Sequence, residues 1–196
     1  KYKDSKIVFE AIKKKSWKKA NNLAKKDDLL KKIVDWHFIY DNNDPKFFNT
    51  TKSFIKKNPD WPSNKYFRKK VEMFIDRNLS NTKIIEFYNI NPPLTTKGAV
   101  NYVDALKKDR GIENIESIIK ETWIKRKFTK RQSKDFYKKY KKVLTVSDHN
   151  KRTDKLTWNG RSYEARRMLT LVSKKKKNLY NAKIILRRRA GNADHA

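Results

Sequence analysis

The sequence predicts an all-α fold, an α-solenoid or superhelix of irregular stacked helical hairpins with about twelve short helices and no sheet. Three observations predict this class. The 196 residues include only four Gly and five Pro, too few for the many tight turns of a sandwich or barrel. Apolar residues recur every three or four positions along most of the chain. Helix-stop residues separate these stretches at short intervals, and a short hairpin with one apolar face must stack on a neighbour to bury it.

The apolar periodicity and the stop residues together place the individual helices. The predicted ranges are 6–15, 16–26, 28–41, 46–57, 63–78, 81–89, 96–109, 112–126, 130–142, 146–159, 161–172 and 174–189. Residues 112–127 show the pattern most clearly. The apolar stripes of this and three further helices are Ile112, Ile115, Ile118, Ile119 and Trp123; Val100, Val103 and Leu106; Ala165, Met168, Leu169 and Val172; and Leu179, Ala182, Ile185 and Leu186. Trp123 and Trp158 are both expected in the core, because large aromatic side chains dominate apolar burial.

Local signals mark several helix starts and turns. Thr129 followed by Gln132, and Thr145 followed by Asp148, have the spacing of capping boxes. Gly111 and Gly160 follow periodic stretches and are expected to close helices in a left-handed conformation. The breaks 58–63 and 91–96 contain the helix-stopping residues Pro59, Pro62, Pro92 and Pro93. Basic residues at the predicted helix ends face the negative pole of the macrodipole, at Lys56 and Lys57, Lys107 and Lys108, and Arg187 to Arg189.

The chain is strongly basic, with a formal net charge of +30. This charge raises nucleic acid, an anionic membrane surface or another polyanion as possible partners. The lysines are spread over nearly every segment, which favours a solvated surface over one dedicated polyanion site. The basic stretches 138–142 and 174–177 lie near Phe136, Tyr137 and Tyr140, which are interpreted as core aromatics rather than stacking platforms for bases. No apolar run reaches the length of a membrane span, the longest being 33–40, broken by Asp35 and His37.

The sequence offers no pattern for a catalytic, metal or cofactor site, and none is expected. The absence of Cys excludes a disulfide framework and thiolate ligands. His37, His149 and His195 are too scattered for a metal site or triad; His37 is interpreted as a packed helix residue and His195 as part of the tail. The densest polar stretch is 145–160, where Asp148, Arg152 and Lys155 or Lys151 are spaced to form a carboxylate–guanidinium network on one helix, interpreted as structural.

Three motifs in order resemble one known family. They are NPDWPS at 58–63 with Arg68 and Glu72 following, NPPLTTKG at 91–98, and LTVSDHNKRTDKLTWNGRSYEARRML at 144–169. Together, over residues 30–190, they resemble the helical N-terminal region of soluble lytic murein transglycosylases of the α-proteobacterial type. The run DH-x-x-R-x-D followed by W-x-G-R at 148–161 is the most specific part of the likeness.

The resemblance implies a periplasmic parent enzyme that cleaves the MurNAc-β-1,4-GlcNAc bond of peptidoglycan and forms 1,6-anhydro-MurNAc. In that family one Glu serves as acid and then base, in a lysozyme-like domain C-terminal to the helical region. The family's Glu-Ser signature has only Glu116-Ser117 as a counterpart here, and this pair is interpreted as a coincidence on a solvated helix face. Residues 1–196 are therefore expected to form one non-catalytic α-superhelical domain, truncated at its C-terminal side.

The expected partners are peptidoglycan glycan strands, bound through the full-length protein, and the protein's own C-terminal catalytic domain. The helical region is expected to shape the ring and hold glycan strands, with no cofactor. A free-standing basic helical-repeat module that binds nucleic acid or protein partners is the alternative, with nucleic acid the less favoured.

Overall fold

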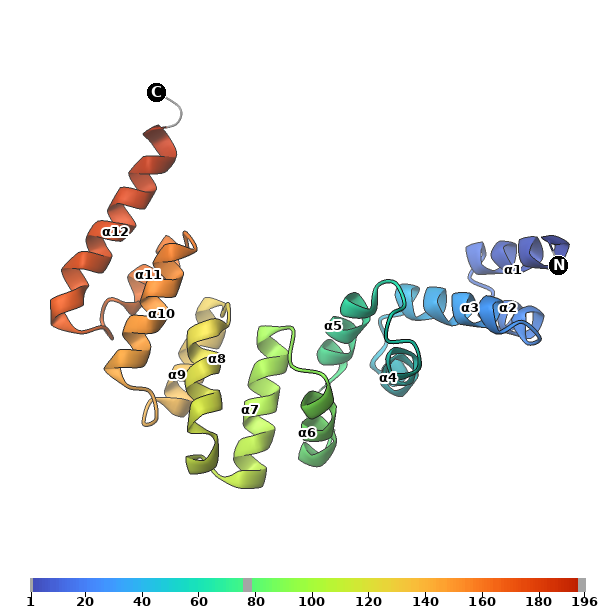
Figure 1. The fold of residues 1–196 in the computed structure, drawn as a ribbon, viewed down its shortest axis with the longest axis horizontal. Helices are drawn as coiled ribbons and strands as arrows, with labels where there is room; N and C mark the ends of the chain where they lie inside the picture. Colours follow the sequence, from blue (N-terminus) through green and yellow to red (C-terminus); the bar gives the residue numbers. More distant parts are fainter. Residues whose placement is uncertain (1, 76–78, 194–196) are drawn as a thin grey trace. The chain divides into compact units, whose positions relative to one another are not determined.

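The computed structural model of the chain describes residues 2–75 and 79–193, with the side chains of residues 5–75 and 79–187. This part contains twelve α-helices and two short 3-10 helices and no strand, which confirms the predicted all-α class (Figure 1). None of these helices is both long enough and apolar enough to cross a membrane. The chain divides into two compact units, Lys1–Leu79 and Ser80–Ala196. The single superhelical domain expected from the sequence stays a prediction.

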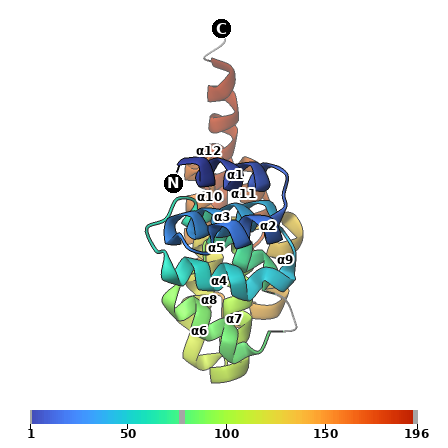
Figure 2. The ribbon, with the colours of Figure 1, turned by 90° about the vertical axis from the view of Figure 1, so that its right-hand side faces the viewer.

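The first unit contains five α-helices and one 3-10 helix. Their bounds are α1 (Tyr2–Lys13), α2 (Trp17–Ala24), α3 (Asp28–Asp41), η1 (Pro45–Phe47), α4 (Phe48–Lys57) and α5 (Asn64–Phe74). Helices α1, α2 and α3 pack on one another, and α4 contacts both α3 and α5 (Figures 1 and 2). The apolar core of the first three helices includes Val8, Ala20 and Val34, all fully buried. The helix predicted at 63–78 ends at Phe74, and residues 76–78 lie outside the described part.

A buried lysine joins α5 to the end of α3. Lys70 is only 3% exposed, and its Nζ donates to the backbone carbonyls of Ile39, Tyr40 and Asn42. These carbonyls lie in and just after the last turn of α3, where backbone acceptors lack helical partners. Burial lowers the pKa of Lys70, against the opposing charge of Asp41. The ammonium therefore serves as a tertiary cap for α3, which the sequence pattern did not reveal.

The second unit contains seven α-helices and one 3-10 helix. Their bounds are α6 (Asn81–Ile90), α7 (Thr96–Arg110), η2 (Glu113–Ile115), α8 (Glu116–Lys125), α9 (Lys130–Tyr140), α10 (Val146–Trp158), α11 (Ser162–Met168) and α12 (Lys174–Ala193). Successive contacts link α6 to α7, α7 to α8, α8 to α10, and α10 to both α11 and α12. The Tyr140 hydroxyl of α9 donates to Asp104 of α7 and connects these two helices. All twelve helices lie close to their predicted positions.

Most of the predicted local signals are confirmed. Thr129 with Gln132 and Thr145 with Asp148 both form complete capping boxes. Gly111 and Gly160 have φ angles of 78° and 70°, in the region that favours glycine. The last turns of α4 and α7 carry basic residues as predicted. The run 187–189 does not end its helix, because α12 continues to Ala193.

Two predictions about buried faces are wrong. Trp158 is 82% exposed. It lies two residues beyond the buried Leu156, and at about 100° per residue this turns its side chain to the opposite side of α10. Helix α12 buries Tyr180 and Ile184 and leaves Leu179 and Leu186 exposed, which are 51% and 66% accessible. The polar contacts of Tyr180 with α10, described below, set this rotation of α12.

Candidate functional site

The centre of the second unit is an arginine packed against two neighbouring aromatic rings. The Arg152 guanidinium carbon lies 4.3 Å from the ring centroid of Trp123 and 4.9 Å from that of Phe128. Its Nη1 donates to the backbone carbonyl of Trp123 and, at 3.2 Å, to that of Arg126. These carbonyls lie at the C-terminal end of α8, where acceptors are unpaired and a cation is favoured. Arg152 therefore fastens α10 to the end of α8.

The predicted Asp148–Arg152 pair is wrong. Asp148 instead accepts hydrogen bonds from the backbone amide and the hydroxyl of Thr145, at 2.9 and 2.7 Å. The carboxylate is thus occupied by the N-terminal cap of α10. Arg152 contacts α8 instead, where backbone carbonyls accept its hydrogen bonds and the Trp123 ring makes a cation–π contact with its guanidinium.

His149 completes the contact between α8 and α10. Its Nδ1 accepts a hydrogen bond of 3.2 Å from the indole Nε1–H of Trp123, so the ring is neutral at this atom. Burial lowers the pKa of His149, and the nearby Arg152 charge also lowers it, while Asp148 acts in the opposite direction. The histidine is therefore a packed structural residue, only 5% exposed.

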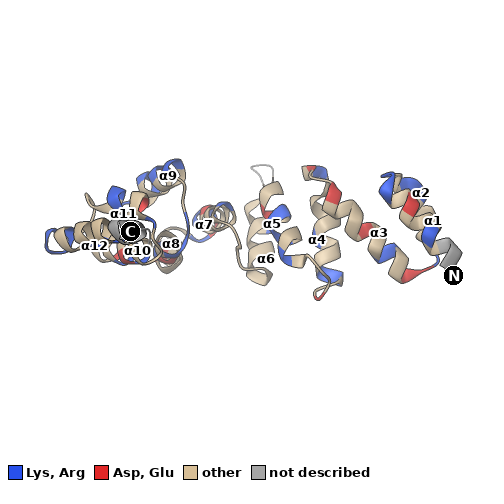
Figure 3. Cartoon of the chain, turned by 90° about the horizontal axis from the view of Figure 1, so that it is seen from above, with Lys and Arg blue, Asp and Glu red and all other residues tan. Residues whose placement is uncertain are grey.

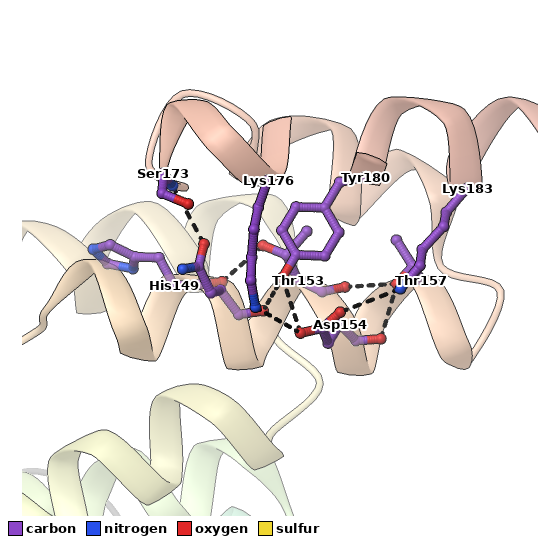
Figure 4. A network of polar contacts seen from close by, with 9 residues as sticks. His149, Thr153, Asp154, Thr157, Ser173, Lys176, Tyr180 and Lys183 are labelled. Carbon is purple, nitrogen blue, oxygen red and sulfur yellow. Dashed lines mark hydrogen bonds and ion pairs between the residues drawn. The ribbon is translucent and has the colours of Figure 1, made fainter. Parts of the chain in front are cut away.

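A different face of α10 contacts α12. The Tyr180 hydroxyl donates to Asp154 Oδ2 at 2.9 Å and lies 3.1 Å from the carbonyl of Asn150 (Figure 4). Burial and the adjacent carboxylate raise the pKa of Tyr180. Lys183 and Lys176 of α12 lie 3.5 and 4.0 Å from the same carboxylate (Figure 4). The motif residues of α10 thus connect it to α8 on one face and to α12 on another.

The other two motifs also occupy joints between helices. Asn58 and Asn91 cap the ends of α4 and α6 through their side-chain amides, at 3.0 and 3.3 Å. The carbonyl of Pro62 accepts from Trp36 Nε1 at 2.8 Å. Thr95 caps α7, and Thr96 Oγ1 donates to the carbonyl of Lys127 at 2.8 Å. All three motifs therefore have a structural role in how the helices meet.

A pocket of about 240 Å³ lies beside the Arg152 cluster, lined by residues of α8, α9, α10, α11 and the turn after α11. Helix α9 contributes Lys130, Lys134 and Tyr137 at spacings of four and three residues, which places them on one face of the helix. Ser133 lies on the same side. Because a pocket for a drug-sized molecule has at least roughly 300 Å³, this one suits a single small group.

The floor and the walls of the pocket differ in exposure. Trp123 and Arg152 are only 1% and 2% exposed, so they form the floor, which solvent barely reaches. Tyr137 and Leu171 are half-buried walls, and Arg167 is an exposed residue at the rim. A molecule in the pocket would therefore contact mainly the walls and the rim, above a cation–aromatic floor.

The pocket is electropositive. Its lining includes four cationic side chains, Lys130, Lys134, Arg152 and Arg167, and one carboxylate, Glu164. That carboxylate is bound by Arg161, whose Nε donates to it at 2.9 Å.

Burial and neighbouring charges shift the pKa values of two groups that line the pocket, Glu164 and Arg152. Burial is the largest single influence and opposes ionisation of Glu164, but the hydrogen bond from Arg161, a backbone hydrogen bond and the charges of Arg161 and Arg167 together outweigh it and lower the pKa of Glu164. Burial and then the charges of Arg161 and Arg167 lower the pKa of Arg152 to about 10. Arg152 stays charged at neutral pH, and Glu164 is an ion-pair acceptor rather than a proton donor.

The other residues singled out in the sequence lie outside this pocket or in the core. Phe136 and Tyr140 are buried, which confirms their core interpretation, whereas Tyr137 lines the pocket. The lysines of 138–142 and 174–177 are exposed, and Lys and Arg occur on helices of both units (Figure 3). Glu116 is on the exposed surface of α8 and pairs with Lys120 at 3.0 Å. His37 packs on Trp36, and His195 lies outside the described residues.

Sequence reasoning missed Lys130, Lys134 and Arg167 as members of one site. The row on α9 was readable from spacing alone, but its partners lie on three other helices, α8, α10 and α11. No protein-family model matches the chain, and neither the curated proteins nor the solved structures include a significant match.

Proposed function

We propose that the chain is the helical, non-catalytic region of a lytic murein transglycosylase, and that it holds the anionic strands of peptidoglycan for the catalytic domain of that enzyme. Under this proposal the protein works in the periplasm, and the catalytic domain cleaves the MurNAc-β-1,4-GlcNAc bond with formation of 1,6-anhydro-MurNAc. The helical region has the role of shaping the ring around that domain. The resemblance of the three ordered motifs supports this identity.

The observation that carries the binding role is the electropositive pocket beside the motif run 148–161. Arg152 of this run forms part of the floor, and Arg161 holds the single carboxylate of the lining. A cationic, partly aromatic pocket complements a sugar or peptide group that carries a carboxylate. Peptidoglycan is such a polyanion, because its stem peptides and muramic acid carry carboxyl groups.

The overall charge supports long-range attraction to the same partner. With 51 basic and 21 acidic residues, at least 30 cations have no carboxylate of their own. Such an excess attracts a polyanion over roughly 10 Å at moderate salt and is screened as salt rises. Nucleic acid would feel the same attraction, and the test below therefore compares both polyanions.

The test is co-sedimentation of the purified chain with sacculi at increasing NaCl, beside a gel shift with single- and double-stranded DNA and RNA. The proposal expects the chain to sediment with sacculi at low salt and to be released as salt rises. It also expects no release of anhydro-muropeptides by the chain alone. Tight shifts of nucleic acid without sacculus binding, or retention that does not change with salt, would refute it in favour of the basic-module alternative.

A further inference from the structure

The pocket formed by α8, α9, α10 and α11 has features that a surface patch of lysines lacks. Its cationic side chains come from three different helices, so folding brings them together. Arg152 is 2% exposed, and its Nε is buried with no hydrogen-bond partner in the described part of the chain. An unpartnered buried donor on a charged group is costly, and an anion nearby would compensate it.

The size and the walls of the pocket restrict what the anion can be. A volume of about 240 Å³ holds one sugar ring or one to two amino-acid residues, not a stretch of polymer. Tyr137, Met168 and Leu171 give the walls an apolar character. A compact inorganic anion would leave these walls unused, whereas a carboxylate on a carbon body would use both the walls and the cationic rim.

We propose that this pocket binds a carboxylate-bearing group of peptidoglycan, with the carboxylate at Lys134 and Arg167 above Arg152 and the carbon body against Tyr137 and Leu171. This inference rests on the proposed function and adds the place and the chemistry of recognition. The carboxylate has two possible sources, the stem peptide and the lactyl group of muramic acid. Neutral N-acetylglucosamine oligomers lack it and are the reference ligand.

The test is an NMR titration of the full 196-residue chain, labelled with ¹⁵N, with three ligands in separate arms. The ligands are a stem tetrapeptide with free carboxylates, N-acetylmuramic acid and chitotetraose. For a group this small we expect a dissociation constant on the order of 1 mM for at least one carboxylate ligand. The shifts should include the Trp123 indole N–H and the amides of Ser133 and Tyr137, and chitotetraose should cause none of them.

The variant Lys134→Glu with Arg167→Glu reverses two rim charges at exposed positions that form no ion pair within the described part of the chain. It should weaken binding at least tenfold. The control, Lys175→Glu with Lys177→Glu, changes the net charge equally at exposed positions of α12 outside the pocket. It should bind like the wild type, and circular dichroism should show both variants folded.

The failures of the two proposals are distinguishable. Binding to sacculi without any response to either carboxylate ligand would overturn the pocket inference, and the proposed function would then rest on the motif resemblance and the overall charge alone. A response to a carboxylate ligand without binding to sacculi would keep the pocket and overturn the proposed function. Equal loss of binding in the rim variant and the control would show general charge attraction only and would overturn the pocket inference.

Discussion

Trp123 and Trp158 offer a matched pair of substitutions in the same unit of the chain. Trp123 is 1% exposed, and its ring contacts Phe128, Phe136 and the Arg152 guanidinium. Trp123→Ala should lower the free energy of unfolding by about 3–5 kcal/mol, as truncations of buried Trp do. The upper part of this range is expected, because Arg152 loses a ring contact and stays buried.

Trp158→Ala should change the free energy of unfolding by no more than about 0.5 kcal/mol, since the side chain is 82% exposed. The assay is urea denaturation followed by far-UV circular dichroism, with thermal melts beside it. The Trp123 variant should melt roughly 10–20 °C below the wild type, at about 3–5 °C per kcal/mol for a unit of this size. Equal effects of the two substitutions, or a larger loss for Trp158, would refute the assignment of the core.

Two further predictions concern titration and capping. The pKa of His149 in the folded chain lies below its ordinary value of about 6.5. As pH falls from 6.5 towards the folded-state pKa, the unfolded chain binds a proton that the folded chain does not, so the free energy of unfolding decreases by at most about 1.4 kcal/mol per pH unit. Above pH 6.5 this loss is absent. His149→Asn keeps an acceptor for Trp123 and should remove this part of the loss between pH 7.5 and 5.5 in urea titrations; an unchanged pH profile would contradict the assignment. Lys70→Met removes the donor to three backbone carbonyls and should lower the free energy of unfolding by about 1–3 kcal/mol. The control Lys69→Met, at the exposed neighbouring position, should leave the free energy of unfolding nearly unchanged. Equal melting temperatures of the two variants would contradict the role of Lys70 as a cap.

Much of the fold was predictable because its signals are local. Helix positions followed from apolar spacing, and the capping boxes at Thr129 and Thr145 followed from side chains three residues apart. The glycine turns at Gly111 and Gly160 required only a positive φ after a periodic stretch. These features depend on neighbours within one or two helical turns, which the sequence displays directly.

The errors arose where distant residues decide the outcome. Helix α12 buries Tyr180 because the Tyr180 hydroxyl donates to Asp154 of α10 and lies beside the carbonyl of Asn150. The apolar residues of α12 alone predicted that a different face of this helix is buried. Arg152 binds carbonyls of α8 rather than its i−4 neighbour Asp148.

The pocket required the same kind of long-range information. The α9 row of Lys130, Lys134 and Tyr137 is visible in the sequence, but its closure by Arg152 and Arg167 depends on the packing of three other helices. Spacing on a single helix could have indicated the α9 row, which was not singled out from the sequence, and it could not have indicated the residues of the other helices.

The most direct test of the account compares two preparations of the same sacculi, one intact and one with its carboxylates converted to neutral amides by carbodiimide chemistry. Mass and glycan structure are kept while the negative charge is removed. At 0.15 M NaCl, the fraction of the protein that sediments with neutralised sacculi should be at least about fivefold lower than the fraction that sediments with intact sacculi, because the basic surface then has no anion to contact. Equal sedimentation with both preparations would contradict it.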